Sequence, residues 1–446
     1  MLPKIIDLFS GCGGLALGFE KAGFEIAAGL ELMPKACETI NQNLSLRYSK
    51  KTNHICGDIT KLEGDCFKSL VGPEGCIVIG GPPCQAYSMA GRGKMMSLGE
   101  DKALMNDARG YLFKDYLRFV YGMDARAVVM ENVPEATKFG TMNIPEIVCE
   151  DLISHGYKAY WTVITSADYG VPQIRSRIIL FGIKESEEKN IELPIPTNKP
   201  QDNIKFSRRY SDFEKYPHFV KPNLPANDLP YWNTVGNAFS DLPRLFPTID
   251  SIYKARALTE KLEYRTEIKN YYQEQMRNWY NKKTEFVTAN TFRRTKRDIP
   301  IFDRMKQGDD YFDASVIADA LLSEKAKELR IKAGTKTYEK LKKEIVPPYD
   351  RKRFQGKWRR LDENLPSHTV IAHMCKDTYS YIHPWEPRGI SVREAARLQS
   401  FPDDFQFTCS MSDAFKQIGN AVPPLMAYGI AKTVLKTFGG NDYDSL

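Results

Sequence analysis

The 446-residue sequence predicts an α/β fold with a doubly wound sheet. Through the first 185 residues, short β-branched runs alternate with amphipathic stretches, and the runs are apolar enough to be buried on both faces. This alternation is typical of strands joined by helices that cover the sheet. A glycine-rich turn follows the first run, so we expect a Rossmann-like architecture.

The elements follow in order from these patterns. Runs rich in Val and Ile predict strands at 4–9, 25–30, 54–57, 76–80, 127–130, 159–165 and 177–182. Apolar residues at helical spacing predict the helices between them, at 15–22, 34–43, 111–121 and 144–155. The strand and helix order returns near 391–400 and again over 413–438.

The middle of the chain differs in charge and pattern. Residues 184–360 are polar, lack the alternation, and carry 37 Lys and Arg against 26 Asp and Glu, an excess of 11 positive charges. The whole chain has a net charge of only +7, so the remaining residues are net negative. A basic second domain inserted into the first is therefore expected, and an anionic partner suits it.

Cysteine usage and hydropathy bound the class of protein. Nine cysteines occur without any CxxC pair, which disfavours a disulfide framework and a zinc site, so no metal is expected. Most of them are expected to be buried structural residues. No apolar run approaches the ~20 residues that span a bilayer. We expect a cytoplasmic protein that does not enter a membrane.

Residues 7–14, DLFSGCGG, join the first strand to the first helix. Glycines there permit a tight turn and let a ligand approach the backbone at a helix N-terminus. Glu31 ends the next strand, where an acid commonly accepts hydrogen bonds from ribose hydroxyls. Gly11, Gly13 and Ala16 fit a loose dinucleotide-binding pattern, and the alternative is an ordinary strand-to-helix turn.

Cys84 stands in the string GGPPCQAYS, residues 80–88, directly after the fourth strand. Two prolines fix the backbone before it and present the sulfur at the carboxyl edge of the sheet, where open α/β folds bind ligands. A buried core cysteine has no need of this rigid approach. Cys84 is therefore the candidate nucleophile, acting as a thiolate.

Two further segments supply acid and guanidinium groups. Glu131 ends an apolar strand, and a partly desolvated carboxylate suits a proton donor. Gln173, Arg175 and Arg177 alternate and are expected to share one strand face, with two forked donors for a carboxylate, a carbonyl or a phosphate. The alternatives are a surface acid and a solvated strand edge.

Six strings together resemble the ordered motif set of the DNA (cytosine-5)-methyltransferases: DLFSGCGG, GGPPCQAYS, MENV, DYGVPQIRSR, RGISVREAARLQSFPDDF and QIGNAVPP. The resemblance covers the first 185 residues and the last 80 or so. It implies a Rossmann-like S-adenosylmethionine-dependent methyltransferase domain over 1–185, completed by 408–446. A smaller inserted target-recognition domain and hinge would occupy 186–407.

The resemblance also assigns roles to the candidate residues. The Cys84 thiolate would add to carbon-6 of cytosine while Glu131 bonds ring nitrogen-3, which gives carbon-5 the enamine character needed to take a methyl group. Arg177 would hold the base carbonyl oxygen and Arg175 would help to order Glu131. S-adenosylmethionine would lie against Phe9, Gly11, Gly13, Gly14, Glu31, Asp58, Pro82, Asn420 and Val422. Leu32 stands where several relatives carry an aromatic residue beside adenine.

Double-stranded DNA is the implied partner, with the target cytosine flipped out of the helix to reach Cys84. Residues 85–106 resemble the loop that closes over the flipped base, and Gln85 and Ser88 would be its DNA contacts. Basic clusters in the middle segment could meet phosphates, each with a solvated charged face as the alternative: 293–297, 351–353 and 358–360.

Three other functions remain as alternatives. A tRNA cytosine-5 methyltransferase shares the Pro-Cys and Glu-Asn-Val pieces, but the Cys-Phe-Thr tripeptide of those relatives does not occur here. A catalytically dead DNA-binding homologue is disfavoured by intact Cys84, Glu131, Arg175 and Arg177. An NAD-dependent oxidoreductase would leave the Pro-Pro-Cys string without a purpose.

The expected biological role is bacterial. A short chain without appended chromatin-type modules suits restriction-modification or another phage-defence system, with cognate restriction or defence proteins as partners. A solitary regulatory methyltransferase is the alternative role. The protein is expected to be a monomer.

Overall fold

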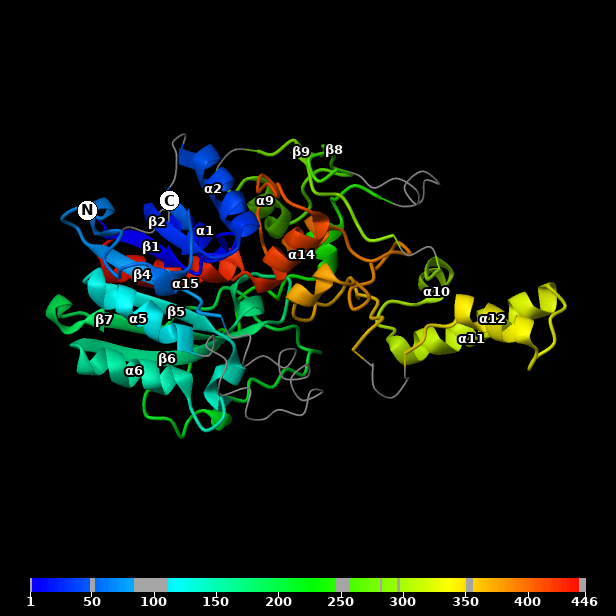
Figure 1. Ribbon diagram of the computed structural model, residues 1–446, viewed down its shortest axis with the longest axis horizontal. Coiled ribbons are helices and arrows are strands. Elements are labelled where there is room, and N and C mark those ends of the chain that lie inside the picture. Colours follow the sequence, from blue (N-terminus) through cyan, green and yellow to red (C-terminus); the bar gives the residue numbers. More distant parts are fainter. Residues whose placement is uncertain are drawn as a thin grey trace. The chain divides into compact units, whose positions relative to one another are not determined.

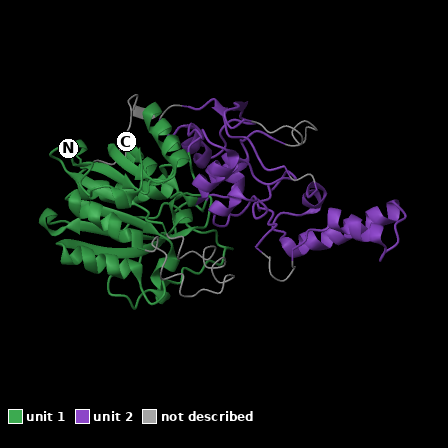
Figure 2. Ribbon diagram, in the orientation of Figure 1, with its two compact units in different colours: residues 1–232, 399–401, 420–446 green, residues 233–398, 402–419 purple. Residues whose placement is uncertain are grey.

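The computed structural model describes residues 2–48, 53–83, 111–245, 257–280, 283–294, 297–349 and 356–440. The chain forms two compact units, coloured separately in Figure 2. Unit 1 comprises residues 1–232, 399–401 and 420–446, and unit 2 comprises 233–398 and 402–419. Residues 186–232 thus belong to the first compact unit.

Unit 1 is built on a seven-stranded sheet with the order β3-β2-β1-β4-β5-β7-β6 (Figure 1). Its strands are β1 (Lys4–Leu8), β2 (Ile26–Glu31), β3 (His54–Cys56), β4 (Cys76–Gly80), β5 (Ala127–Asn132), β6 (Tyr157–Thr165) and β7 (Ser176–Lys184). The first five pair in parallel, and β7 is antiparallel to both β5 and β6. The predicted α/β class is confirmed, and each predicted strand is present within two residues of its expected ends.

The helices of unit 1 alternate with these strands, as predicted. They are α1 (Gly14–Lys21), α2 (Pro34–Tyr48), α5 (Leu112–Gly122), α6 (Ile144–Ser154) and α15 (Pro424–Thr437). Short 3-10 turns connect them: η1 (Ile59–Lys61), η2 (Lys68–Leu70), η4 (Pro134–Lys138), η5 (Ser166–Tyr169), η6 (Glu185–Glu187) and η7 (Tyr210–Asp212). Apolar residues of α5 and α6 share one core with alternate residues of the central strands.

Helix α15 packs closely against α1, and the small residues of α1 allow it. A Cβ atom added at Gly18 would lie 2.4 Å from the Cβ of Ala427 and from the backbone nitrogen of Tyr428. Real Cβ contacts do not come this close, so any larger residue at Gly18 would push the helices apart. The C-terminal helix therefore returns to the start of the chain, and its close neighbour there is the first helix.

Unit 2 is mostly helical and irregular. Its elements are α7 (Val235–Phe239), β8 (Leu262–Glu263), α9 (Tyr271–Arg277), β9 (Phe286–Val287), α10 (Ile299–Arg304), α11 (Tyr311–Glu328), α12 (Lys336–Ile345), η8 (Ala372–Cys375), α13 (Val392–Leu398) and α14 (Met411–Asn420). One small apolar core joins α10 and α11 to Trp358 and Ile382. Elsewhere its interior combines buried apolar side chains with buried ion pairs.

Arg397, on α13, is the centre of one such group. Its guanidinium donates to both carboxyl oxygens of Asp403, each at 2.6 Å, and to both oxygens of Asp241, at 3.1 and 3.2 Å. All three side chains are fully buried. Planar forked donors match two carboxylates at once, which is why arginine suits this position.

The described helices and cysteines bear on the expectations about membrane spans and buried thiols. Among the described helices, none combines the length and the apolar character needed to cross a membrane. None of the eight described cysteines forms a disulfide, and four of them are buried: Cys12, Cys37, Cys76 and Cys149. The prediction that most would be buried core residues is therefore wrong, because Cys56, at the exposed end of the edge strand β3, and Cys66, in the connection after η1, are exposed, and Cys375 and Cys409 are only partly buried.

Candidate functional site

The candidate residues of unit 1 gather at one edge of the sheet. Parallel strands end on the same side, so the residues that follow β1, β2, β4 and β5 meet there. Because β7 runs antiparallel to β5, its first residues lie at this edge too, and Ile178 pairs with Asn132. The fold thus brings together residues that are up to 170 positions apart in sequence.

The turn between β1 and α1 is held in a left-handed conformation. Phe9, Gly11 and Gly13 have φ angles of 56°, 55° and 91°. A Cβ atom at Gly14 would lie 2.2 Å from the carbonyl oxygen of Val422, so this glycine is required for the chain to return over the turn. In front of Gly11, by contrast, an added Cβ meets no atom within 4 Å.

Glu31 locks this turn from the end of β2. One carboxyl oxygen accepts a hydrogen bond from the Gly11 backbone at 2.8 Å, and the other accepts one from the Met33 backbone at 2.7 Å. The side chain is buried, with an exposed fraction of 8%. An open position at Gly11 beside a fixed carboxylate fits the ribose and amino acid portions of S-adenosylmethionine.

Asp58 begins the turn η1 after β3. Its carboxylate accepts hydrogen bonds from the Thr60 hydroxyl at 2.8 Å and the Thr60 backbone at 3.1 Å, and these bonds lower its pKa. An acceptor held in this way is available to an amino group. Leu32, which stands where the family resemblance leads one to expect an aromatic residue, is 65% exposed.

Glu131 is paired with Arg177 across the β5–β7 junction. The Arg177 Nε atom lies 2.9 Å from a Glu131 carboxyl oxygen, and the two side chains are 11% and 13% exposed. A Cβ at Gly81 would stand 3.0 Å from the other Glu131 oxygen, so this carboxylate faces the residues that follow β4. A carboxylate and a guanidinium therefore stand together beside the Pro-Pro segment.

Arg175 and Gln173 lie differently from the prediction. Strand β7 begins at Ser176, so the expectation that both share its face with Arg177 is wrong. Gln173 instead donates to the side-chain oxygen of Gln399 at 2.8 Å, and Arg175 is 3% exposed. The reason is the turn η5, which folds residues 166–175 back on themselves before the strand starts. The ordering role of Arg175 stays a prediction.

Some of the remaining candidate residues are described by the structure and others are not. Pro82 is buried, and its carbonyl oxygen accepts a hydrogen bond from the Asn132 side chain at 3.3 Å. Val422 is buried beside Gly14, whereas Asn420, at the end of α14, is exposed. Cys84, Gln85 and Ser88 lie outside the described residues, which resume after Pro83 at Tyr111.

Asn132 and Asp7 are site residues that the sequence analysis missed. Asn132 ties β5 to the backbone of Pro82, which precedes the candidate nucleophile Cys84 by two residues. Asp7 is a charged residue inside the apolar run of β1, and that interruption could have drawn attention to it. Neither of its carboxyl oxygens accepts a hydrogen bond from any described residue. Burial, and next the charge of Glu31, raise its pKa well above the usual value.

An Asp7→Asn substitution is expected to stabilise the protein at alkaline pH relative to acid pH. With a raised folded-state pKa, Asp7 penalises folding once the unfolded carboxyl ionises, above about pH 4. Asparagine does not titrate, so the variant's free energy of unfolding should gain about 1 kcal/mol or more on wild type between pH 5 and pH 8. Denaturant unfolding measures this, and exposed Asp65→Asn is the control. A difference that is constant with pH would contradict the assignment.

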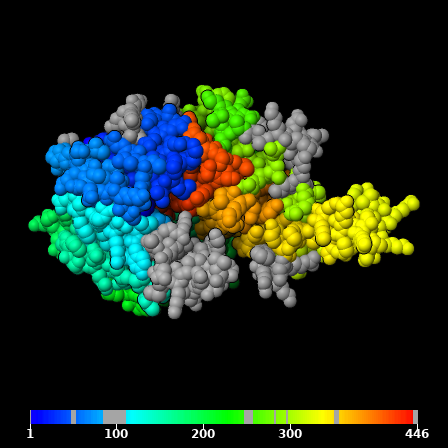
Figure 3. Space-filling model, viewed as in Figure 1, coloured from blue at the N-terminus to red at the C-terminus, as the bar shows by residue number. Residues whose placement is uncertain are grey.

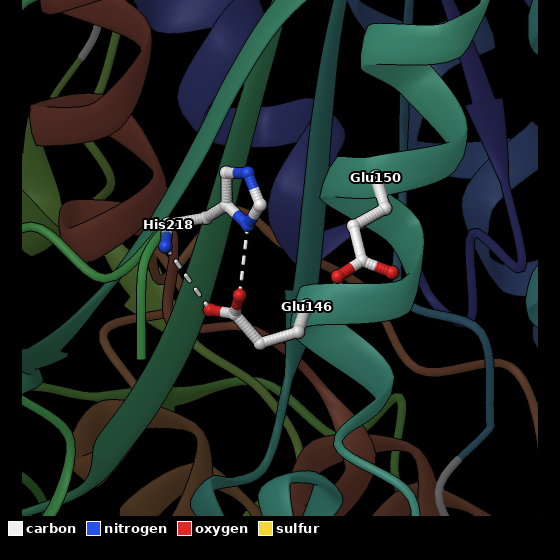
Figure 4. Close-up of side chains that lie close together, drawn as sticks. All are labelled: Glu146, Glu150 and His218. Atoms are coloured by element: carbon white, nitrogen blue, oxygen red, sulfur yellow. Dashed lines mark hydrogen bonds and ion pairs between the residues drawn. The ribbon is translucent and has the colours of Figure 1, made fainter. Parts of the chain in front are cut away.

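A cluster of Glu146, Glu150 and His218 has the residue types of a metal site, with one possible ligand atom from each within 4.8 Å of the others (Figure 4). Both Glu146 oxygens already have protein partners. One receives the Trp161 indole at 2.5 Å, and the other lies 2.7 Å from the His218 ring nitrogen Nδ1. These contacts tie residue 218 to α6 and β6, which is a structural role.

Known proteins similar to this chain are DNA methyltransferases, in agreement with the family resemblance of its motifs. The model of the family described as C-5 cytosine-specific DNA methylase matches residues 3–436. M.OihORF3336P of Oceanobacillus iheyensis, whose name places it among type II methyltransferases, is 49% identical over 98% of this chain and 96% of its own. The type II methyltransferase M.AgeI of Thalassovita gelatinovora is 29% identical over 97% of this chain and 99% of its own.

A solved structure shares the fold. It is a DNA modification methyltransferase encoded within an E. coli prophage, with a TM-score of 0.65 and 22% identity, covering 98% of this chain and 99% of that one. The family match spans nearly the whole chain, both units included. The chain belongs to the C-5 cytosine-specific DNA methylase family and is a DNA (cytosine-5)-methyltransferase that depends on S-adenosylmethionine.

Proposed function

We propose that the protein methylates cytosine within one short sequence of double-stranded DNA through a covalent adduct at Cys84. The observation that supports this most is the Glu131–Arg177 ion pair beside Pro82, because it sets an acid and a cation next to the rigid approach to Cys84. Carbon-5 of cytosine is a weak nucleophile, and covalent addition divides one difficult step into easier ones.

In this proposal each residue acts on the cytosine ring. The Cys84 thiolate forms a bond to carbon-6, and Glu131 holds a proton at ring nitrogen-3, so that electron density moves to carbon-5. Arg177 keeps the Glu131 carboxyl in place and is close enough to the same edge to donate to the base carbonyl oxygen. Carbon-5 would then form a bond to the methyl group of the cofactor, whose sulfur–methyl bond breaks to leave the demethylated thioether. Water would take the proton from carbon-5, the proton on nitrogen-3 would return to Glu131, and breaking the bond between carbon-6 and sulfur would expel the Cys84 thiolate and restore the ring.

The cofactor supplies an electrophilic methyl group, and unit 1 would hold it at the glycine turn. Glu31 fixes the turn through Gly11 and offers its remaining lone pairs to ribose hydroxyls. Asp58 offers a carboxylate oxygen to an adenine amino group, and Phe9 borders the opening of the turn. Pro82, Gly13, Gly14, Asn420 and Val422 complete the proposed pocket.

We further propose that residues 186–407, which include nearly all of the basic segment 184–360, form the target-recognition domain and hinge, and that Gln85 and Ser88 contact DNA near the flipped base. The role would be host protection in restriction-modification or another phage-defence system, with cognate restriction proteins as partners. The type II methyltransferase names of the relatives support this role over a solitary regulatory one. A cytoplasmic monomer stays a prediction.

Bisulfite sequencing of DNA from a host that expresses the gene tests the proposed function. The expected result is 5-methylcytosine confined to one short motif and absent from the same host without the gene. This readout reports activity, the nucleic acid class and the recognition sequence together. Unmodified DNA in cells that contain the folded protein would contradict the proposal, and methylation of RNA alone would replace DNA as its substrate.

A further inference from the structure

Helices α11 and α12 of unit 2 form a hairpin whose outer half is strongly charged. Residues 323–345, from the second half of α11 to the end of α12, hold eight Lys and Arg against four Glu. Figure 2 shows the hairpin extending from the rest of unit 2, and Figure 3 shows its surface in yellow. The segment is far more basic than the chain average.

The hairpin is anchored at one end and exposed at the other. Tyr311, Ala314 and Ala318 of α11 belong to the core around Phe302 and Trp358. The outer half has a thin interior, and α12 has no buried residue at all. Packing therefore holds the base rigid, while the charged residues of the outer half stand in solvent.

Most cations of this outer half have no carboxylate partner. Lys325 is paired with Glu328 at 2.8 Å. Within the part of the chain that the structure describes, no ion pair or hydrogen bond involves the charged groups of the other seven, all of them exposed: Lys327, Arg330, Lys332, Lys336, Lys340, Lys342 and Lys343. Uncompensated charge at this density repels itself, and an anionic partner would relieve that repulsion.

Helix stability does not explain the arrangement. Lysines in the last turn of α12 are favourable beside the negative end of the helix dipole, but Lys336 is the first residue of the helix, where a cation is unfavourable. Lys336, Lys340 and Lys343 are spaced i, i+4 and i+7, so they share one face of α12. Their backbone positions span about 10 Å, because each residue advances the helix by about 1.5 Å.

Other basic clusters of unit 2 are occupied internally. The Arg293 guanidinium donates to the carbonyl oxygens of Met374 and Cys375 and to the Ser412 hydroxyl. Arg360 is buried and donates to the carbonyl oxygens of Phe302, Met305 and Pro384. Arg297 is paired with Asp298 at 2.6 Å. The contacts of Arg293 and Arg360 join distant segments of unit 2, whereas the charged groups of the outer half of the hairpin, apart from Lys325, make no such contacts among the described residues.

We propose that the α11–α12 hairpin is a backbone-binding arm that contacts the phosphates of duplex DNA through the Lys336, Lys340 and Lys343 face. This inference rests on the proposed function, because DNA is the polyanion that the protein acts on. A duplex carries one negative charge per about 1.7 Å of its axis, so a lysine row of this length can meet several phosphates. The contacts would add affinity without reading sequence.

Salt dependence of binding is the measurement that tests the arm. The triple variant K336Q/K340Q/K343Q keeps helix-favouring side chains and removes three charges. Affinity for a duplex of about three helical turns and arbitrary sequence is measured by fluorescence anisotropy from about 50 to 200 mM salt. Each lost phosphate contact lowers the slope of log K against log salt by about 0.9, so a fall of about 2.7 is expected, with affinity lower on the order of a hundredfold near 0.1 M.

Two comparison variants keep the test specific. K68Q/K158Q/K436Q removes three exposed lysines of unit 1 that lie outside the segment 186–407 and controls for the loss of net charge, so its slope should fall by less than that of the hairpin variant. K336R/K340R/K343R preserves the charges and should retain the wild-type slope. Circular dichroism verifies that each variant is folded.

An unchanged slope in the glutamine variant, or equal falls in both glutamine variants, would overturn the arm. Loss of binding to an acidic protein with DNA binding intact would also overturn it and assign the hairpin to a protein partner. The two proposals fail separately. A protein that methylates its motif but shows no slope change contradicts the arm alone, and a slope change without methylation contradicts the proposed function alone.

Discussion

Replacing Cys84 by serine is expected to abolish methyl transfer and to leave S-adenosylmethionine binding intact. A serine hydroxyl is protonated at neutral pH and adds to carbon-6 far more slowly than a thiolate, so the rate should fall by at least about a thousandfold. The cofactor pocket proposed at Gly11, Glu31 and Asp58 does not include this side chain. Transfer of a labelled methyl group to DNA measures the rate, and calorimetry measures cofactor affinity.

Cys66→Ser is the matched control for that experiment. Cys66 is an exposed thiol in the connection after η1, and none of the proposed steps uses it. The control should methylate at the wild-type rate, which excludes a general effect of cysteine removal. Normal turnover by Cys84→Ser would show that the covalent mechanism is wrong, whatever the family.

Replacing Arg397 by methionine is expected to destabilise unit 2 by about 3 to 5 kcal/mol. The substitution leaves the buried carboxylates of Asp241 and Asp403 without the guanidinium that pairs with both. Burial raises the pKa of Asp241 even with Arg397 present, which shows how far this site disfavours a bare negative charge. Calorimetry should record a fall of about 10 °C in the unfolding temperature of the transition that contains unit 2.

The control for this prediction is Arg265→Met, also in unit 2. Arg265 is exposed, so its loss should change the unfolding temperature little. If both variants unfold at similar temperatures, the Arg397 group does not carry the stability assigned to it. Substitution of Arg397 together with Asp241 and Asp403 by apolar residues should recover part of the loss, because no buried charge is then left alone.

The sheet of unit 1 could be predicted because its strands are nearly continuous apolar runs. Lys4–Leu8, Cys76–Gly80 and Ala127–Asn132 are buried along almost their whole length, so pattern and position agree. The antiparallel direction of β7 could not be predicted. The apolar pattern of a strand indicates on which faces it is buried, but it does not indicate whether the neighbouring strand is parallel or antiparallel.

Because the direction of β7 is not encoded in the strand pattern, the residues that β7 contributes to the site could be predicted only in part. Glu31 ends β2, as predicted, and therefore lies at the carboxyl edge of the parallel strands, whereas its contact with the cofactor stays a prediction. The ion-pair partner of Glu131 depends on the residue at which β7 begins. In the structure the Nε atom of Arg177 lies 2.9 Å from a carboxyl oxygen of Glu131. The hydrogen bond from Asn132 to Pro82 could not be predicted, because it joins residues 50 positions apart in sequence.

Unit 2 was harder to anticipate from sequence for a physical reason. Helix α11 buries mainly small residues such as Ala314, Ala318 and Ala326, which give a weak apolar stripe. Arg397 and Asp241 are 156 positions apart, and charged residues in a polar segment resemble surface residues until the fold buries them. Net charge predicts a segment with an anionic partner, but only the contacts separate paired arginines from unpaired lysines.

The most direct measurement of the central claim is a covalent trap at the target base. A duplex that carries 5-fluorocytosine at the methylated position cannot release the enzyme, because fluorine does not leave as a proton does. In the presence of S-adenosylmethionine we expect a complex that survives denaturation and whose cross-linked peptide contains Cys84. The Cys84→Ser variant should form none. An adduct at another residue, or no adduct while ordinary cytosine in the same duplex is methylated, would contradict the account.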